Sequence, residues 1–214
     1  MLIEVDIERQ HLERMLLGVT FFNDVKKLGA EQYEILISLA RVYKVSPGEV
    51  VIHKGDIDSS VYFLLKGQLE VYTGDTPKPE EKVNYISPGE SFGTFAMLND
   101  ADRSATIAAD DNCFEVFLLS LNAELFGDIL THELVSLDTK LAFYRMACHS
   151  ARWKLEMYKI EHSDSPLINK LRDIKLFIGE KGSQQELEAL KEQAQALSDL
   201  LNQWNGYFNN LKFD

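Results

Sequence analysis

Residues 91–106 read SFGTFAMLNDADRSAT, and this stretch decides how the chain is interpreted. Gly93 lets the backbone approach a ligand closely because it has no Cβ. Residues 95–98 are expected to form one helical turn, whose free N–H groups and positive dipole end suit an anion. Arg103 adds a permanent charge and a planar fork of donors that fits phosphate oxygens, so the stretch predicts an anion site. The candidate ligand-binding residues are Gly93, Thr94, Phe95, Ala96, Arg103, Ser104 and Ala105.

The stretch lies inside a series of short β-like segments that covers residues 41–120. The segments are separated by turns that contain Gly or Pro, such as Lys66-Gly67 and Pro88-Gly89. About seven short strands at regular spacing predict an antiparallel barrel or sandwich. The expected strands cover residues 50–53, 61–65, 69–72, 83–86, 105–109 and 113–119.

Helical patterns flank the expected strands on both sides. Upstream, residues 8–17 and 30–40 carry apolar side chains at helical spacing. Downstream, a helix is expected over about residues 133–161, and at 1.5 Å per residue it is roughly 40 Å long. Apolar and aromatic side chains along it alternate in steps of three and four residues, which is a heptad seam. We therefore expect a homodimer through residues 134–162, with packing inside the chain as the alternative.

The remaining chain, residues 163–214, is expected to form two further helices. The first starts at Pro166 and carries an apolar face as far as Gly179, and the second starts at Ser183. Glu186 lies three residues after Ser183, which is the spacing of a capping box. This part contains six basic and eight acidic residues and no glycine-rich turn between two short helices. It therefore indicates helical packing or the docking of a protein partner, rather than contact with nucleic acid.

The composition favours a soluble globular protein and argues against several kinds of site. The net charge is −12, whereas a duplex-binding surface needs clustered Lys and Arg. Cys113 and Cys148 have no CxxC spacing and the histidines stand singly, so we expect two buried, reduced thiols and no metal site. No apolar run approaches the roughly 18 residues of a membrane span, and the N-terminus lacks a signal-peptide pattern. We therefore expect a cytoplasmic protein without a membrane partner.

Residues 92–106 closely resemble the phosphate-binding cassette of cyclic-nucleotide-binding domains, the family of the bacterial catabolite activator proteins and the kinase regulatory subunits. That cassette reads F-G-E-L-A-L-x-x-x-x-P-R-x-A-T, and this sequence aligns with it without a gap. Turns on either side also follow the family's order, so the resemblance covers about residues 20–160. The matching cassette residues are Phe92, Gly93, Ala96, Arg103, Ala105 and Thr106, and the matching turns lie at residues 47–49, 54–56 and 88–90.

The resemblance implies an α+β fold: an antiparallel β-roll or jelly-roll barrel with flanking helices, a long C-terminal dimerisation-type helix and an α-helical tail. We expect residues 1–125 to form the roll with its N-terminal helices and residues 126–162 the connecting helix. Residues 163–214 then form a helical extension in place of the DNA-binding winged helix of the best-known members. The resemblance also implies cyclic AMP or cyclic GMP as the ligand. By approximate alignment, His149 and Ser150 lie where base-contacting residues sit.

Two of the departures from the cassette bear on ligand binding. Thr94 replaces a glutamate that typically accepts a hydrogen bond from the ribose, and losing such a bond costs about 1.5–3 kcal/mol, or roughly 10- to 100-fold in affinity. Asp102 replaces the proline beside Arg103, and both it and Asp100 are placed to pair with that cation and repel a phosphate. Three outcomes fit these changes: weak binding of a cyclic nucleotide, binding of a different anion, or no ligand.

These features favour a regulatory sensor or adaptor that binds a cyclic nucleotide or related anion and signals through helices to a protein partner. The alternative is a degenerate scaffold that serves protein interaction or dimerisation without a ligand. A DNA-binding transcription regulator is disfavoured by the acidic charge. The sequence contains no nucleophile–base pair, paired acids or metal set in a motif context, so we expect no enzyme activity and name no catalytic residue.

Overall fold

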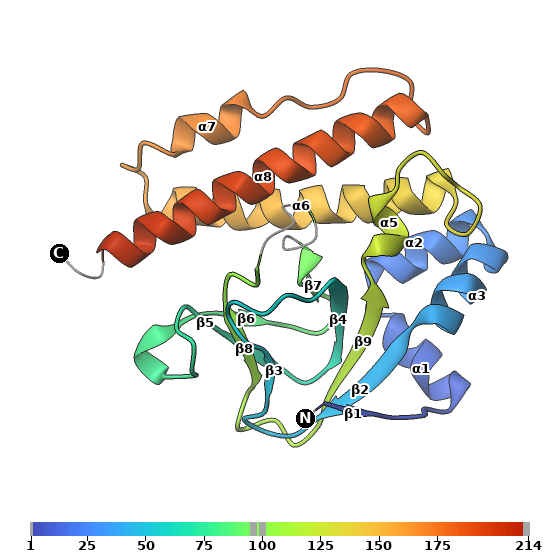
Figure 1. The fold of residues 1–214 in the computed structure, drawn as a ribbon, viewed down its shortest axis with the longest axis horizontal. Coiled ribbons are helices and arrows are strands. Elements are labelled where there is room, and N and C mark those ends of the chain that lie inside the picture. The colour runs from blue at the N-terminus through green and yellow to red at the C-terminus, as the bar shows by residue number, and fades with distance from the viewer. Residues whose placement is uncertain (1, 95–97, 99–101, 212–214) are drawn as a thin grey trace. The chain divides into compact units, whose positions relative to one another are not determined.

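The computed structural model describes residues 2–94, 98 and 102–211, with side chains described up to residue 205. The chain divides into two compact units, Met1–Gly127 and Asp128–Asp214 (Figure 1). Among the described residues, every strand lies in the first unit, and the second contains helices and connecting segments. None of the described helices has a stretch both long and apolar enough to pass through a membrane.

Two antiparallel sheets form the core of the first unit. The five-stranded sheet has the order β1-β2-β9-β4-β7, and the four-stranded sheet has the order β3-β8-β5-β6. This arrangement confirms the predicted antiparallel β-roll. The strands of the first sheet are β1 (Ile3–Glu4), β2 (Arg41–Val45), β9 (Val116–Asn122), β4 (Ser60–Lys66) and β7 (Ser91–Phe92), and those of the second are β3 (Val50–Ile52), β8 (Thr106–Ala109), β5 (Leu69–Tyr72) and β6 (Lys82–Ile86).

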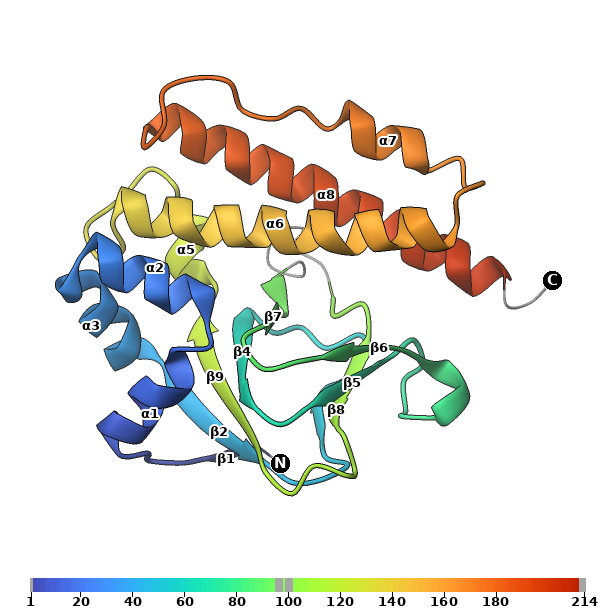
Figure 2. The same cartoon turned by 180° about the vertical axis from the view of Figure 1, so that it is seen from behind.

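Short helices lie on the outer face of the five-stranded sheet (Figure 2). Helices α1 (Arg9–Leu16) and α3 (Ala30–Leu39) begin and end within one residue of their predicted bounds, and α2 (Thr20–Leu28) lies between them. Helix α5 (Glu124–Gly127) follows the last strand, and a 3₁₀ turn at Pro79–Glu81 precedes β6.

Strand β4 is apolar on both faces because both faces are covered. Successive side chains of a strand point to opposite sides. Tyr62 and Leu64 belong to the core cluster between the two sheets. Phe63 faces the other way and packs on α2, with its ring centroid 5.6 Å from that of Phe21 and 5.2 Å from that of Phe22. This double burial explains why the segment is a continuous apolar run rather than an alternating one.

The last strand starts three residues later than the sequence predicted. Residues 110–113 form a turn, in which the Asp110 side chain accepts a hydrogen bond from the Asn112 amide at 2.8 Å and the Asp110 carbonyl accepts one from the Cys113 amide at 3.0 Å. This local side-chain bond competes with the sheet for the backbone. Cys113 is half-buried in the turn, so the expectation of two buried thiols holds for Cys148 alone, and both cysteines are free.

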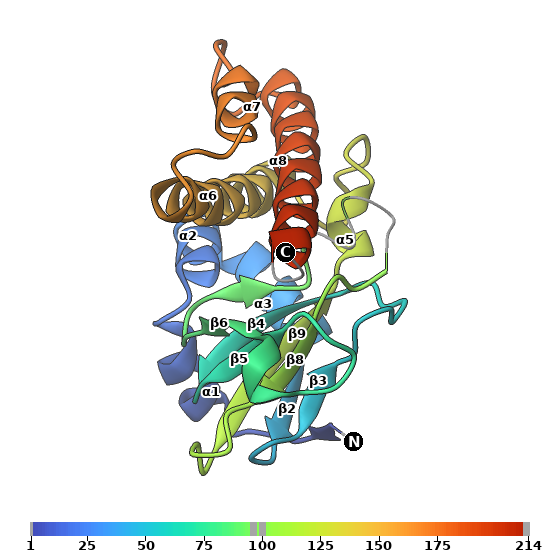
Figure 3. The same cartoon turned by 90° about the vertical axis from the view of Figure 1, so that its left-hand side faces the viewer.

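Helices α6 (Leu137–Glu161) and α8 (Gln184–Leu211) pack along each other in the second unit (Figure 3). The Cys148 Sγ donates to the Leu190 carbonyl at 3.4 Å, and the rings of Tyr158 and Trp204 lie 6.0 Å apart. Part of the heptad seam that we assigned to a homodimer is thus used within the chain.

The N-termini of both long helices are capped by serine. The Ser136 hydroxyl accepts from the Thr139 amide at 3.3 Å, and the Ser183 hydroxyl accepts from the Glu186 amide at 3.2 Å, as the capping-box spacing predicted. The Glu186 carboxylate, however, accepts from the Gly182 amide at 2.7 Å, one residue before the expected position. The cap therefore satisfies donors on both sides of the helix start.

Helix α7 (Ile168–Asp173) is much shorter than predicted. We expected it to reach Gly179, but the backbone is already extended at Ile174, with φ −72° and ψ 107°. β-Branched and aromatic residues follow it and lower the helix propensity, and an isolated short helix has little stability of its own. As a result Leu176 and Ile178 do not join a packed face, and 66% and 97% of their surfaces are exposed.

Candidate anion site

The described part of the cassette lies in the first unit, where β7 ends and β8 begins. Of the predicted ligand-binding residues, Phe95 and Ala96 lie outside the described residues, as does Asp100. Gly93 follows β7 directly, and Arg103 stands three residues before β8. Two segments that are ten residues apart in the sequence therefore meet at one place.

Gly93 is required at its position by the geometry of the backbone. Its φ is +83°, in the left-handed region that L side chains rarely adopt. A Cβ at this residue would lie 2.5 Å from Nη1 of Arg103 and 2.9 Å from the carbonyl oxygen of Ser60. The glycine thus makes room for the guanidinium of the cassette arginine.

The Arg103 guanidinium is buried, with 4% of the residue exposed. Nη1 donates to the Gly93 carbonyl at 2.6 Å, and Nη2 donates to the Ser60 carbonyl at 2.6 Å and to Oδ2 of Asp58 at 2.7 Å. The Tyr62 ring lies beneath it, 5.9 Å from the guanidinium carbon. Nε is buried and has no hydrogen-bond partner among the described residues. Three hydrogen bonds hold the guanidinium, and its buried Nε–H group is left for another acceptor.

The backbone of Arg103 is fixed by the turn that follows β3. The Arg103 amide donates to the Asp56 carbonyl at 2.9 Å, and the Gly55 amide donates to the Arg103 carbonyl at 2.8 Å. The Lys54-Gly55-Asp56 turn is one of the turns that match the family's order in the sequence, and it thereby positions the cassette arginine. Such paired backbone bonds hold the residue in place before any ligand arrives.

Asp58 is the acidic partner of Arg103. Its Oδ1 accepts from the Ser60 amide at 2.8 Å, and its Oδ2 accepts from the Tyr62 hydroxyl at 3.0 Å as well as from Arg103. Burial alone would raise the pKa of Asp58, but the hydrogen bonds from Arg103 and Ser60 outweigh it and lower that pKa. Burial and the neighbouring Asp58 charge raise the pKa of Tyr62 to about 12, so this hydroxyl stays a donor.

The acid that pairs with the cassette arginine is thus Asp58, whereas the sequence had pointed to Asp102 and Asp100 as acids placed to pair with it. Asp102 is exposed, and it forms no hydrogen bond or ion pair with another residue in the described part of the chain. Asp58 lies 45 residues before Arg103, so no local motif linked the two. The only local signal was the Asp58-x-Ser60 spacing of an Asx turn at the start of a strand.

The other predicted site residues of the first unit differ in how far they are exposed. The Thr94 side chain is buried, Ser104 is exposed and Ala105 is half-buried. Neither Ser104 nor the Ala105 amide hydrogen-bonds to another described residue.

The two residues predicted to contact a base lie in the second unit, on α6. His149 is exposed and Ser150 is half-buried. Their role toward a nucleotide stays a prediction. Over the described residues, no group of three or more His, Cys, Asp and Glu side chains is arranged to hold a metal ion.

Comparison with known proteins agrees with the resemblance found in the sequence. Residues 42–133 match the family model of the cyclic nucleotide-binding domain, which confirms that resemblance over these residues. A cAMP-dependent protein kinase regulatory subunit of Colletotrichum orbiculare is 38% identical over 87 residues, which are 41% of this chain and 21% of that protein. The corresponding subunit of Mycosarcoma maydis is 35% identical over 127 residues, 57% of this chain and 23% of that protein.

Among solved structures, one that this chain matches is the regulatory domain of Toxoplasma gondii PKA with cAMP. It is 19% identical, covers 79% of this chain and 59% of that chain, and gives a TM-score of 0.49. This chain spans about a fifth of the length of the curated relatives it matches.

Proposed function

We propose that the first unit is a regulatory module that binds a cyclic nucleotide, or a related anion, through Arg103. The observation that carries this proposal is the buried guanidinium, whose Nη groups are fixed by Gly93, Ser60 and Asp58 while Nε lacks an acceptor. A charged donor in this state is the group that a phosphate oxygen satisfies. The names of the regulatory-subunit relatives support the same ligand class.

The affinity of this site is set by the internal acid. A phosphate that approaches Arg103 meets a guanidinium already paired with Asp58 at 2.7 Å, rather than an isolated cation. The field that attracts an anion is therefore weaker than that of an unpaired arginine. Together with Thr94 in place of the ribose-binding glutamate, this supports weak rather than tight binding of cyclic AMP or cyclic GMP.

We propose a binding role and not catalysis for the whole chain. A cytoplasmic location, a protein partner reached through the C-terminal helices, and no nucleic-acid partner complete the proposal. The kinase-associated names of the relatives support a protein partner, and the net charge of −12 argues against a duplex.

A homodimer through residues 134–162 remains part of the proposal, with a change in the residues that carry it. Because α8 occupies part of the heptad seam, the contact has to use side chains of α6 that stay exposed. Trp153, Met157 and Ile160 are exposed and recur at helical spacing, so they form one apolar face.

A second candidate function is a scaffold that binds no ligand. The Arg103–Asp58 pair favours it, because an internal carboxylate already supplies the charge that a phosphate would bring. In this case the buried pair keeps a structural role and the chain works through its helices alone.

Isothermal titration of the full chain with cyclic AMP and with cyclic GMP separates the two functions. The module predicts heat with at least one nucleotide, and a loss of roughly ten-fold or more in affinity for Arg103→Lys, which cannot make the same planar contacts. Arg41→Lys, on β2, is the matched control and keeps the affinity of the parent chain. Silence of the folded parent protein at millimolar concentrations of both nucleotides overturns the module and leaves the scaffold.

A further inference from the structure

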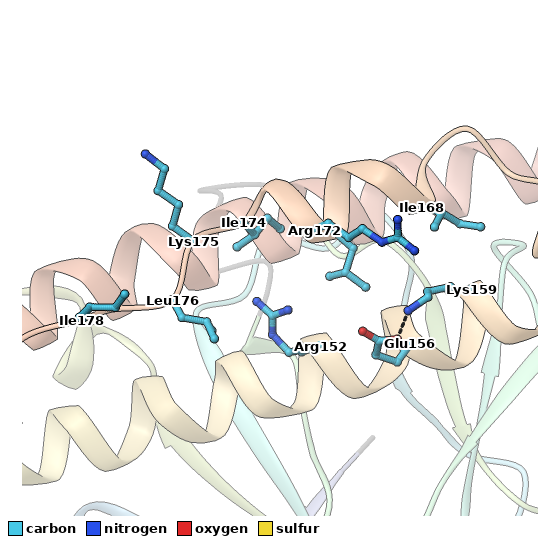
Figure 4. Close-up of a pocket in the computed structure, with 10 residues that line it drawn as sticks. Arg152, Glu156, Lys159, Ile168, Arg172, Ile174, Lys175, Leu176 and Ile178 are labelled. Atoms are coloured by element: carbon cyan, nitrogen blue, oxygen red, sulfur yellow. Dashed lines mark hydrogen bonds and ion pairs between the residues drawn. The ribbon is translucent and has the colours of Figure 1, made fainter.

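The second unit contains a cavity that the proposed nucleotide site does not use. Its volume is about 440 Å³, and it lies between α6 and the segment that runs from α7 to residue 178 (Figure 4). Cavities of this size hold a small ligand or a few side chains of a partner. Every lining residue belongs to the second unit, so the cavity is a property of that unit alone.

The cavity is basic although the chain is strongly acidic. Arg152, Lys159 and Arg172 line it, and Lys175 contributes its stem while its ammonium points away from α6 (Figure 4). The acidic lining residue, Glu156, is paired with Lys159 at 2.7 Å, and both side chains are substantially exposed. Exposed pairs of this kind are weak and exchange readily with a competing carboxylate. The cavity therefore favours an acidic occupant.

Arg152 gives the strongest reason to infer a ligand. Its Nη2 is buried and has no hydrogen-bond partner among the described residues. Figure 4 shows the guanidinium directed from α6 toward the segment around Ile174. A buried charged donor without an acceptor is unfavourable, and an incoming carboxylate removes that penalty. The planar fork of the guanidinium also matches a carboxylate through two parallel bonds.

Apolar side chains surround this basic centre. Ile168, Leu171 and Ile174 line the cavity wall, and the strongly exposed Leu176 and Ile178 stand at its edge. Large aliphatic groups that remain in water next to the buried Nη2 of a half-buried arginine suit an occupant that is apolar on both sides of an acid. A plain inorganic anion would leave them uncovered.

We propose that this cavity binds an acidic, apolar peptide segment of a protein partner, with a carboxylate on Arg152 and apolar side chains over Leu176 and Ile178. Arg152 and Lys159 are two helical turns apart, about 10 Å along α6, so the basic groups match several carboxylates along a chain better than one head group. This inference rests on the partner half of the proposed function, and it gives that partner a surface and a chemistry.

Fluorescence anisotropy with labelled synthetic peptides tests the inference on the full chain. The probe is a short peptide of alternating glutamate and leucine, and its control carries lysine at every glutamate position. The proposal predicts that the glutamate peptide binds and the lysine peptide does not. Arg152→Gln weakens binding roughly ten-fold or more, because a charge-assisted bond is lost, while Lys154→Gln removes the same charge from α6 outside the cavity and has little effect.

The apolar half of the proposal has its own matched pair of variants. Leu176→Ser weakens binding several-fold, whereas Leu17→Ser, which removes a leucine with a similar exposed fraction (69%) in the first unit, leaves it unchanged. Both leucines are exposed, so neither change is expected to unfold the chain, and far-UV circular dichroism checks this. Equal binding of the two peptides, or equal effects of Arg152→Gln and Lys154→Gln, overturns the inference.

The peptide result and the nucleotide result can fail independently. If the chain binds the glutamate peptide but not cyclic AMP, the docking surface stands and the ligand half of the proposed function is wrong. The opposite outcome is that Arg152→Gln binds cyclic AMP as tightly as the parent chain does, while the parent chain binds no glutamate peptide. In that case the module stands and the docking surface is wrong.

Discussion

Arg103 is a residue whose role depends on three separate parts of the chain. The turn after β3 holds its backbone, Gly93 leaves space for its guanidinium, and Asp58 balances its charge. The sequence predicted the arginine and the glycine because both belong to one local motif. It did not predict Asp58, because a contact between residues 45 positions apart is created only when β4 lies beside the cassette. At this scale, motif residues were predictable and the partner that tunes them was not.

The substitution Asp58→Asn tests that tuning. It leaves Arg103 with an unbalanced buried charge, so we expect a loss of about 1–3 kcal/mol in the free energy of unfolding, reduced from the value of a fully buried pair because Asp58 is partly exposed. Calorimetry should then show that cyclic AMP raises the melting temperature of the variant more than that of the parent chain. Asp102→Asn is the matched control, and a larger effect there than at Asp58 would restore the original expectation.

The two cysteines should differ sharply toward thiol reagents. Burial raises the pKa of the Cys148 thiol to about 12, and its Sγ donates to a helix carbonyl, so little reactive thiolate exists at neutral pH. Cys113 is only half-buried. A colorimetric thiol assay should therefore find one thiol that reacts quickly and a second that reacts only after denaturation. Two equally fast thiols in the folded chain would contradict the burial of Cys148.

The elements follow the sequence where one local rule decides them. Glycine and proline turns separate the strands from β3 to β6 as predicted, and β4 could be predicted as apolar throughout. The segment after α7 could not, because Ile174 and Ile178 have helical spacing although the backbone is extended at Ile174 and Ile178 is 97% exposed. The heptad seam of α6 had the same ambiguity. An apolar stripe specifies that a face is buried, but not whether the same chain or a second copy covers it.

The capping residue Glu186 links two elements, and its contribution should depend on pH. Burial alone would raise the pKa of Glu186, but hydrogen bonds from Arg145 and the Gly182 amide outweigh it and lower that pKa below the ordinary 4.5. A lowered folded-state pKa gives stability that is present above about pH 4.5 and is lost as the pH falls through the folded-state value. Glu186→Gln should therefore cost about 2 kcal/mol at neutral pH.

Urea unfolding followed by tryptophan fluorescence measures this directly, because both tryptophans, Trp153 and Trp204, lie in the second unit. The difference between the parent chain and Glu186→Gln should shrink as the pH is lowered well below 4.5. Glu188→Gln, two residues further along α8, is the control. A difference that does not change with pH would mean that the carboxylate charge plays no part in the cap.

At the scale of the whole molecule, the chain combines a β-roll that resembles cyclic-nucleotide-binding domains with a helical unit whose exposed groups suit contacts with a protein. The acidic net charge was visible in the composition, whereas the basic cavity around Arg152 was not. It forms from residues of α6, of α7 and of the segment after α7, which come together only in the folded chain. Charge patterns of this kind emerge only when the helices pack.

The exposed face of α6 should carry the homodimer. Multi-angle light scattering without nucleotide is expected to give twice the mass of one chain. Trp153→Ser should lower the measured mass to that of a single chain. Trp153 is 62% exposed, and the substitution removes the largest apolar group from the face that no other part of its own chain covers fully. Leu17→Ser is the control and keeps the dimer. A parent chain with the mass of one copy at all concentrations would contradict the proposed homodimer.

The side-chain resonance of Arg103 in a nitrogen–proton spectrum shows directly whether a cyclic nucleotide binds at this residue. Its Nε–H group is buried and has no acceptor among the described residues, so a phosphate that binds there must change its environment. The resonance is identified by its absence in Arg103→Lys. We predict that it shifts progressively as cyclic AMP is added, while the resonance of Arg152 stays in place. An Arg103 resonance that does not move at millimolar cyclic AMP would contradict the claim that this chain binds a cyclic nucleotide through its cassette arginine.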